Sequence, residues 1–209
     1  MTKSSQALEA RIVETALKMF NESGIEYVGM RELAAALGIR IGNLTYYFPT
    51  KDDLVYRLSL QLSEENSRTI VTNEAMNLSV FFEMLAEVFR NHVRYRCLML
   101  SFVHIMQRNP LIAKRYSKTL TERIDTWERN VQSVIAQGYL KADKQEVVFL
   151  VSSLSLISRF WISEAAVSFR HDSEEVQMKH YLKMIGRIFV PYATPKGKKF
   201  LKEYLDSAE

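Results

Sequence analysis

The sequence predicts an all-α protein, with a small N-terminal helix-turn-helix domain and a larger helical body. Two observations support this fold class. Apolar residues recur at spacings of three and four through most of the chain, and no segment keeps the two-residue alternation of a strand. Four of the seven glycines fall at Gly24, Gly29, Gly38 and Gly42, so tight turns are concentrated near the N-terminus and long helices are expected after them.

Residues 6–23 form the first predicted helix, because apolar residues recur every four positions and Gly24 suits the position just after a helix end. The next segment, residues 31–54, has the sequence RELAAALGIRIGNLTYYFPTKDDL and predicts two short helices around Gly38. Glycine tolerates the positive φ that such a turn requires. This pattern is typical of a helix-turn-helix, whose second helix can enter the major groove of DNA.

The second helix of this motif is expected over about residues 41–48. Leu44 and Phe48, four positions apart, share its inward face, and Pro49 prevents smooth continuation. Thr50 is a good N-cap for the helix that follows.

We assign residues 1–50 to the helix-turn-helix domain and residues 51–209 to the body. The body shows successive helical patterns over residues 51–70, 78–96, 97–108, 111–137, 144–168 and 174–190. After these, Thr194-Pro195 resembles an N-cap followed by proline at the first helical position, which predicts a short C-terminal helix.

The composition is that of an ordinary soluble globular protein, with 47% hydrophobic and 25% charged residues. A single cysteine excludes an internal disulfide. The N-terminus has no apolar signal segment, so we expect a cytoplasmic protein with no membrane partner.

The net charge of the chain is +4, but residues 1–54 hold six basic and seven acidic side chains. The charge distribution is therefore compatible with DNA binding and does little to prove it.

No cofactor, metal or catalytic site can be placed by spacing. The sequence has no phosphate-cradling glycine loop and no recognisable nucleophile–base pair, so we do not expect an enzyme. Cys97 and His104 are seven positions apart and could share a helical face with His92 nearby, but no third metal ligand has convincing spacing. His104 is either a polar group inside an apolar pocket or a hydrogen-bonded core histidine.

Residues 6–54 resemble the DNA-binding domain of the TetR family of bacterial transcriptional regulators. The residues that carry the resemblance are Ile12, Ala16, Phe20, Gly24, Arg31, Leu33, Ala34, Ala36, Gly38, Ile39, Gly42, Leu44, Tyr47, Phe48, Lys51 and Leu54. The resemblance implies a homodimer in which each subunit offers one recognition helix to a palindromic operator. It also implies that the C-terminal body supplies the dimer interface and an inducer pocket.

The chain departs from the family pattern at four positions. Gly29 and Arg40 stand where the family commonly has serine or threonine caps, and arginine is a poor N-cap. Thr45 stands where a phosphate-contacting tyrosine is usual. Ile41 replaces a position that often carries a polar group, and could touch a thymine methyl instead.

The predicted DNA-binding residues lie in and beside the two helices of the motif. They are Arg31, Arg40, Ile41, Gly42, Asn43, Thr45, Tyr46, Tyr47 and Lys51. Asn43, Tyr46 and Tyr47 are expected to share the outward face. Asn43 is the candidate for a base edge, because an amide can pair bidentately with adenine. Tyr47 and Lys51 are the candidates for phosphate contacts.

Two of these assignments keep an alternative. Arg31 either contacts DNA or forms a surface ion pair with Glu32 or Asp53, and Arg40 either contacts the DNA backbone or only aids solubility.

Aromatic residues, methionines and one histidine of the body together indicate an adaptable apolar effector pocket, although for any single one of them a place in the core is the better interpretation. They are Phe82, Phe89, Met99, Phe102, His104, Met106, Trp127, Phe149, Phe160 and Trp161. The last two long helices have apolar stripes broad enough to serve two sides, which suggests a four-helix dimer interface rather than internal packing alone. The candidates are Val148, Val151, Leu154, Ile157, Tyr181, Leu182, Ile185, Ile188 and Phe189.

We therefore expect a DNA-binding transcriptional regulator, a repressor, that binds a palindromic operator as a homodimer and is released by a small apolar effector. The alternative is a DNA-bound interaction protein of the same fold with no small-molecule effector, because fold does not fix function.

Overall fold

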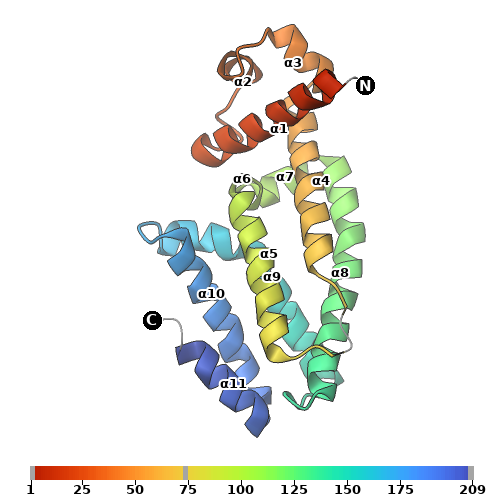
Figure 1. Ribbon diagram of the computed structural model, residues 1–209, viewed down its shortest axis with the longest axis vertical. Coiled ribbons are helices and arrows are strands. Elements are labelled where there is room, and N and C mark those ends of the chain that lie inside the picture. The colour runs from red at the N-terminus through yellow and green to blue at the C-terminus, as the bar shows by residue number, and fades with distance from the viewer. Residues whose placement is uncertain (1–2, 73–74, 207–209) are drawn as a thin grey trace. The chain divides into compact units, whose positions relative to one another are not determined.

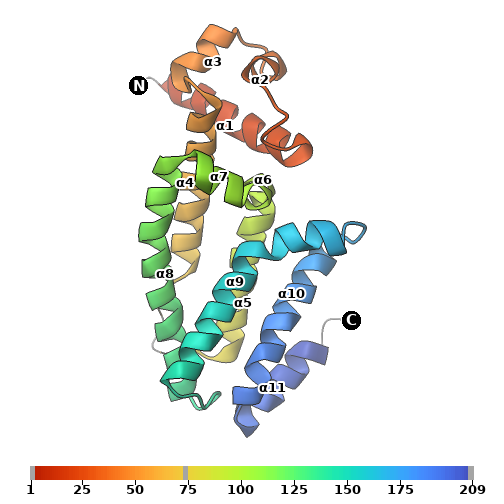
Figure 2. The same ribbon diagram turned by 180° about the vertical axis from the view of Figure 1, so that it is seen from behind.

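The computed structural model describes residues 3–72 and 75–206, and the regular elements in these ranges are helices (Figures 1 and 2). They are α1 (Lys3–Ser23), α2 (Met30–Ala36), α3 (Ile41–Tyr47), α4 (Lys51–Thr69), α5 (Leu78–Arg94), α6 (Arg96–Leu100), α7 (Phe102–Arg108), α8 (Pro110–Ala136), α9 (Lys144–Ser168), α10 (Glu174–Phe189), the 3-10 turn η1 (Val190–Tyr192) and α11 (Pro195–Asp206). The all-α prediction is confirmed. The segment predicted as one helix over 97–108 is instead two short helices, α6 and α7, which meet at Ser101.

The chain divides into two compact units. The first unit contains residues 1–64 and 94–117, and the second contains residues 65–93 and 118–209. This division differs from the predicted boundary at residue 50, because the first part of α4 and the α6–α7 segment belong with the N-terminal helices. The second compact unit is therefore not one continuous stretch of the sequence.

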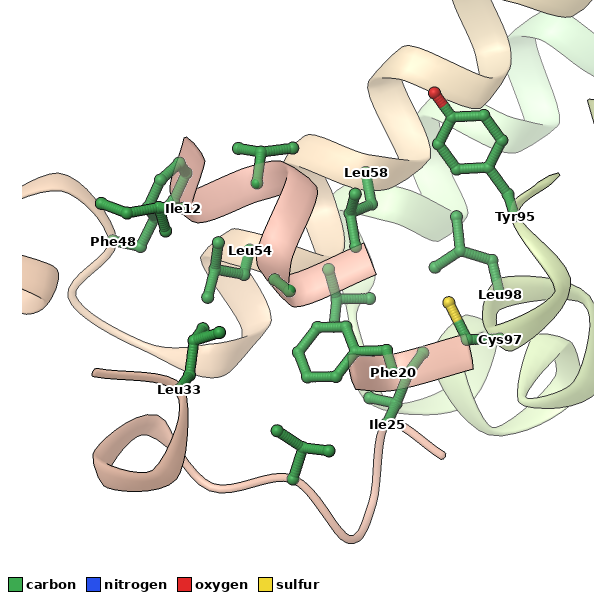
Figure 3. Close-up of a cluster of buried hydrophobic side chains, with 14 of the residues drawn as sticks. Ile12, Phe20, Ile25, Leu33, Phe48, Leu54, Leu58, Tyr95, Cys97 and Leu98 are labelled. Atoms are coloured by element: carbon green, nitrogen blue, oxygen red, sulfur yellow. The ribbon is translucent and has the colours of Figure 1, made fainter. Parts of the chain in front are cut away.

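The first unit is built on one apolar core that α1, α2, α3, α4 and α6 share. Figure 3 shows Ile12 and Phe20 from α1 together with Leu33 from α2, Leu54 from α4 and Cys97 from α6. All five side chains are almost fully buried, between 0% and 2% exposed. The core therefore connects the helix-turn-helix to the α6–α7 segment through side-chain packing.

The turns of the first unit follow the sequence expectations. Gly38 has φ +68°, and the N–H groups of Gly38 and Ile39 donate to the carbonyls of Ala35 and Ala34, which closes the end of α2. Thr50 accepts a hydrogen bond on its Oγ1 from the N–H of Asp53, so Thr50 caps α4 as predicted.

In the second unit, α9, α10 and α11 pack in sequence order, α9 against α10 and α10 against α11. Asp143 caps α9, since its Oδ1 accepts from the N–H of Glu146 at 2.9 Å. Gly197 lies against the loop after α8, because a Cβ built there would approach the carbonyl oxygen of Tyr139 to 2.0 Å. The C-terminal helix is thereby held close to the end of α8.

By length and composition alone, α9 is long and apolar enough to cross a membrane. Seven of its residues are buried inside the subunit, among them Leu150, Leu154 and Trp161. The core helix of a soluble protein meets the same criteria, so this property of α9 is weak evidence for a membrane span.

Candidate nucleic-acid interface

Helix α3 is anchored by its inner side and leaves its outer side exposed. Leu44 is fully buried and Phe48, just after the helix, is 6% exposed. Arg40, Ile41 and Asn43 are exposed around the start of the helix. A short amphipathic helix held by Leu44 can therefore present its first turn to a ligand without losing core contacts.

Asn43 meets the geometric condition for a base contact. It is exposed, and within the described residues its side-chain amide forms no hydrogen bond, so both its donor and its acceptor are available. Thr45, in contrast, is partly buried, and its hydroxyl donates to the carbonyl oxygens of Ile41 at 3.1 Å and Gly42 at 3.3 Å. Its only hydroxyl proton is therefore used inside α3.

The two tyrosines do not share one free face, which corrects the prediction. Tyr46 is 81% exposed. Tyr47 is half-buried against the core of the first unit, and its Oη is hydrogen-bonded to the Oγ of Ser5 at 2.9 Å. The reason is helical spacing: Tyr47 is three positions after Leu44, so it lies at the edge of the inner face. The two rings meet edge to face at 5.3 Å.

Lys51 also has a different environment from the one expected for a phosphate-binding lysine. Its Nζ donates to the carbonyl oxygens of Ile25 at 2.7 Å, Val28 at 3.2 Å and Glu26 at 3.3 Å. An ammonium group has three N–H donors, and these three carbonyls account for all of them. Lys51 therefore ties the α1–α2 loop to the start of α4.

Arg31 does not form the surface ion pair that was its alternative assignment. It is exposed, and in the described part of the chain it makes no ion pair with Glu32 or Asp53. Glu32 instead accepts from the N–H of Gly29 at 3.4 Å, and Asp53 accepts from Thr50. The guanidinium of Arg31 is thus available at the start of α2.

Tyr27, which was not among the predicted DNA-binding residues, is 83% exposed in the loop between α1 and α2. The sequence carries no clear signal for this exposure, because Ile25 and Val28 in the same loop are buried in the core.

The predicted effector residues fall into two groups, one in each compact unit. In the second unit Phe82, Phe89, Trp127 and Trp161 are buried and pack on aromatic neighbours; the rings of Phe89 and Trp161 stack at 4.9 Å. Phe149 is 53% exposed on α9, so it is a surface residue and not part of an internal pocket.

Phe160, also on α9, is partly exposed. In the first unit, Met99 is buried, Phe102 packs edge to face on Tyr116 at 5.1 Å, and Met106 packs against the core. His104 is exposed, so it is not a core histidine, and it lines a surface groove of the first unit.

A buried polar cluster in the second unit was not predicted. His92 lies with its Nε2 3.4 Å from the amide nitrogen of Asn66 and its Nδ1 3.4 Å from Nε1 of Trp161. Asn91 donates to Asn66 Oδ1 at 3.0 Å. Burial, and then the positive charge of Arg123, lower the pKa of His92 to about 3. The ring is therefore neutral, and a neutral imidazole can accept at only one of its two nitrogens.

Most of the predicted dimer residues are buried inside the subunit, which corrects their assignment. Six of the nine are between 1% and 5% exposed, namely Val151, Leu154, Tyr181, Leu182, Ile185 and Phe189. Val148 is 51% exposed, and Ile157 and Ile188 are partly exposed. Apolar residues that do face outward on these two helices are Phe149, Leu156, Val167, Val176 and Met184.

Comparison with known proteins identifies the chain. A family model described as bacterial regulatory proteins, tetR family, matches residues 12–58. A second model, described as bacterial transcriptional repressor, matches residues 60–201 and so covers more than half of the chain. The protein belongs to the TetR family. It is thus a TetR-family transcriptional regulator with a DNA-binding helix-turn-helix, and members of this family are generally not enzymes.

Similar proteins support the same assignment. An HTH-type transcriptional regulator of Staphylococcus aureus strain USA300 is 41% identical over 56 residues, which are 27% of this chain. The chain spans about 30% of the length of the curated relatives it matches. A solved TetR-family regulator from Marinobacter aquaeolei VT8 has a TM-score of 0.89 at 18% identity, covering 99% of this chain and 98% of that one. At this identity the likeness concerns the fold.

Two other solved structures hold small molecules. A putative transcriptional regulator from Saccharomonospora viridis, in complex with choline, has a TM-score of 0.67 at 18% identity, covering 86% of this chain and 96% of that one. A SmeT–triclosan complex has a TM-score of 0.59 at 18% identity, with coverage of 90% and 93%.

Proposed function

We propose that this TetR-family regulator is a cytoplasmic homodimeric repressor that binds a palindromic operator through α3 and is released by a small, largely apolar effector. The observation that carries the DNA-binding part is the exposure of α3: Leu44 anchors the helix while Asn43 and Tyr46 face outward. Family members bind DNA operators, usually as dimers, with small-molecule effectors.

Within this proposal the exposed residues have distinct roles. Asn43 contacts a base edge, since its amide is available on both sides. Arg31, Arg40 and Tyr46 contact phosphates or bases beside it, and Ile41, 40% exposed, contacts a thymine methyl. Gly42 allows close approach, because the space around a Cβ built there is open to 4 Å. Lys51 and Tyr47 support the motif from inside.

The outward apolar residues of α9 and α10 are the proposed dimer surface. Phe149, Leu156 and Phe160 recur at intervals of seven and four, so they form one stripe along α9. Val176 and Met184, eight apart, form a parallel stripe on α10. A second copy of the chain would cover both stripes in a homodimer. To enter successive major grooves, the two α3 helices of this dimer must lie about 34–36 Å apart.

The effector part of the proposal is supported by chemistry and by the relatives in complex with choline and triclosan. The body is rich in buried aromatic residues that suit an apolar ligand. An effector lowers operator affinity only by as much as it prefers the form of the dimer that does not bind DNA. Helix α4, which begins at Lys51 and runs through both compact units, is the proposed coupling element.

The DNA-binding proposal is tested by comparing variants on a duplex that the full-length protein selects from a random library. Asn43→Ala should weaken binding by roughly 1–3 kcal/mol and relax the preference at one base pair. Gln132→Ala, an exposed amide on α8, is the matched control and should bind as the wild type does.

Wild-type affinity for both Asn43→Ala and Tyr46→Ala would contradict the role of α3. Monomers at every concentration in sedimentation equilibrium would contradict the dimer. The effector proposal predicts that a small apolar ligand found by thermal-shift screening lowers operator affinity, and retention of full affinity with every such ligand would favour the effector-free alternative.

A further inference from the structure

The first compact unit contains a groove of about 660 Å³, and of the described residues predicted for the DNA and effector sites only His104 lines it. One wall is the last turn of α1 with the loop after it, and the other wall is α6 with the start of α7. Its volume is within the range of small-molecule sites.

The two walls are held together by one side chain. Asn21 donates from Nδ2 to the carbonyl oxygen of Arg94 at 2.8 Å, and its Oδ1 accepts from the N–H of Cys97 at 2.9 Å. The second bond satisfies a donor at the N-terminus of α6 that has no partner inside that helix. Asn21 therefore holds the end of α1 against the start of α6, so the two walls of the groove belong to one packed unit.

Apolar groups make up much of the groove surface. Phe20 and Cys97, one from each wall, are buried at 1% and 2% exposure, and Figure 3 shows both in the buried apolar cluster of the first unit. Leu100 and Val103 line the α6–α7 side and are 44% and 52% exposed. Burial raises the pKa of the Cys97 thiol to about 12, so this wall carries no thiolate.

The ionisable side chains that line the groove are two carboxylates, Glu22 and Glu26, and one imidazole, His104; no lysine or arginine is among the described residues that do. Neither carboxylate forms an ion pair within the described residues, and Glu26 is close enough for its charge to act on Cys97. Lys51, at the start of α4, has its Nζ bonded to backbone carbonyls of the α1–α2 loop and does not line the groove.

We propose that this groove is a second ligand site, for a small organic cation whose apolar body rests on Leu100 and Val103 and whose ammonium group lies between the carboxylates of Glu22 and Glu26. The two carboxylates would repel an anion, and a neutral ligand would gain no charge–charge attraction from them. A metal ion does not fit, because no group of three metal-ligating side chains occurs among the described residues.

The site has a regulatory consequence, which rests on the proposed function. An occupant touches α1 and α6–α7 together, and α1 packs directly on α2 of the helix-turn-helix. If the cation binds one arrangement of these helices more tightly than another, the ratio of the two affinities sets the largest change in operator affinity that it can cause.

Binding to the full-length protein is measured by calorimetry at pH 8 with 2-phenylethylammonium and with its neutral isostere 2-phenylethanol. The cation should bind more tightly than the alcohol. The double variant E22Q/E26Q should weaken cation binding by roughly two- to tenfold, the effect of removing two largely exposed charge contacts. E9Q/E14Q, with the same charge change elsewhere on α1, is the matched control and should bind as the wild type does.

Val103→Lys places an ammonium group in the groove at an exposed position, and should abolish cation binding even if E22Q/E26Q does not fold. Equal binding of cation and alcohol, or wild-type affinity in Val103→Lys, overturns the proposal. These measurements contain no DNA, so their failure is distinct from failure of the operator proposal. The coupling is measured separately, as the operator affinity with and without the cation.

Discussion

The apolar periodicity of the sequence predicts which side chains are exposed in helix α3 but not in helix α9. In the seven residues of α3 only Leu44 is buried, so the apolar periodicity separates an inner side from an outer side. In the 25 residues of α9 apolar side chains surround the helix: Leu154 is buried at 1%, while Leu156 is 58% exposed. Periodicity therefore assigns sides in a short amphipathic helix and fails in a helix that is apolar all round.

The largest effect should come from the two leucines of α9. Leu154→Ala should lower the free energy of unfolding by about 2–5 kcal/mol, because it removes buried methyl groups and leaves a cavity. Leu156→Ala should leave subunit packing intact and weaken dimer formation instead. Denaturant unfolding at one fixed protein concentration measures the first effect and sedimentation equilibrium measures the second, because the unfolding of any dimeric variant depends on concentration. Equal losses of unfolding free energy in the two variants, with wild-type dimerisation in both, would break the contrast between the two sides of α9.

The buried histidine of the second unit should make stability depend on pH. The pKa of His92 is about 3 in the folded protein against 6.5 for the unperturbed group, so below pH 6.5 the unfolded chain binds a proton that the folded protein does not. Stability should therefore fall as the pH is lowered from 6.5 towards 3, by at most roughly 1.4 kcal/mol per pH unit from this group.

Chemical unfolding of wild type, His92→Gln and the exposed-histidine control His171→Gln measures this slope. The slope should decrease in His92→Gln alone, whatever its absolute stability. An unchanged slope would show that His92 is already charged or that the unfolded chain does not protonate it.

Two glycines of the helix-turn-helix should have different roles, Gly38 in the turn between α2 and α3 and Gly42 in the approach of DNA to α3. Gly38→Ala should cost about 1–2 kcal/mol of stability, because its φ of +68° is unfavourable for any residue with a Cβ. Gly42→Ala should have little effect on stability, since its φ is not positive and its surroundings are open, but it should weaken operator binding if DNA approaches the backbone there. Thermal unfolding together with operator titration distinguishes the two roles.

The smallest effect should distinguish the neighbouring tyrosines. Tyr47→Phe removes the hydrogen bond to Ser5 and should lower stability by about 0.5–1.5 kcal/mol. Tyr46→Phe should leave stability unchanged and act, if at all, on operator affinity. The reverse pattern in unfolding and operator titrations would return Tyr47 to the DNA surface.

The sequence predicted the helix-turn-helix well because its determinants are local. Gly38, Pro49 and Thr50 act on the backbone within a few residues, so the ends of α2, α3 and α4 could be placed before the structure was known. The role of Tyr47 could not be predicted, because its partner Ser5 is 42 positions away.

The body could be predicted only as helices. Which of the apolar residues of α9 and α10 face inward depends on neighbours distant in sequence, and the separation of 94–117 from the rest of the body is a property of tertiary packing. The cluster around His92 joins α4, α5 and α9 through polar side chains that no single helical period reveals.

The position of Lys51 has a mechanical consequence. Three hydrogen bonds from one nitrogen atom attach the α1–α2 loop to the first residue of α4. We therefore expect a displacement of the start of α4 to carry this loop with it.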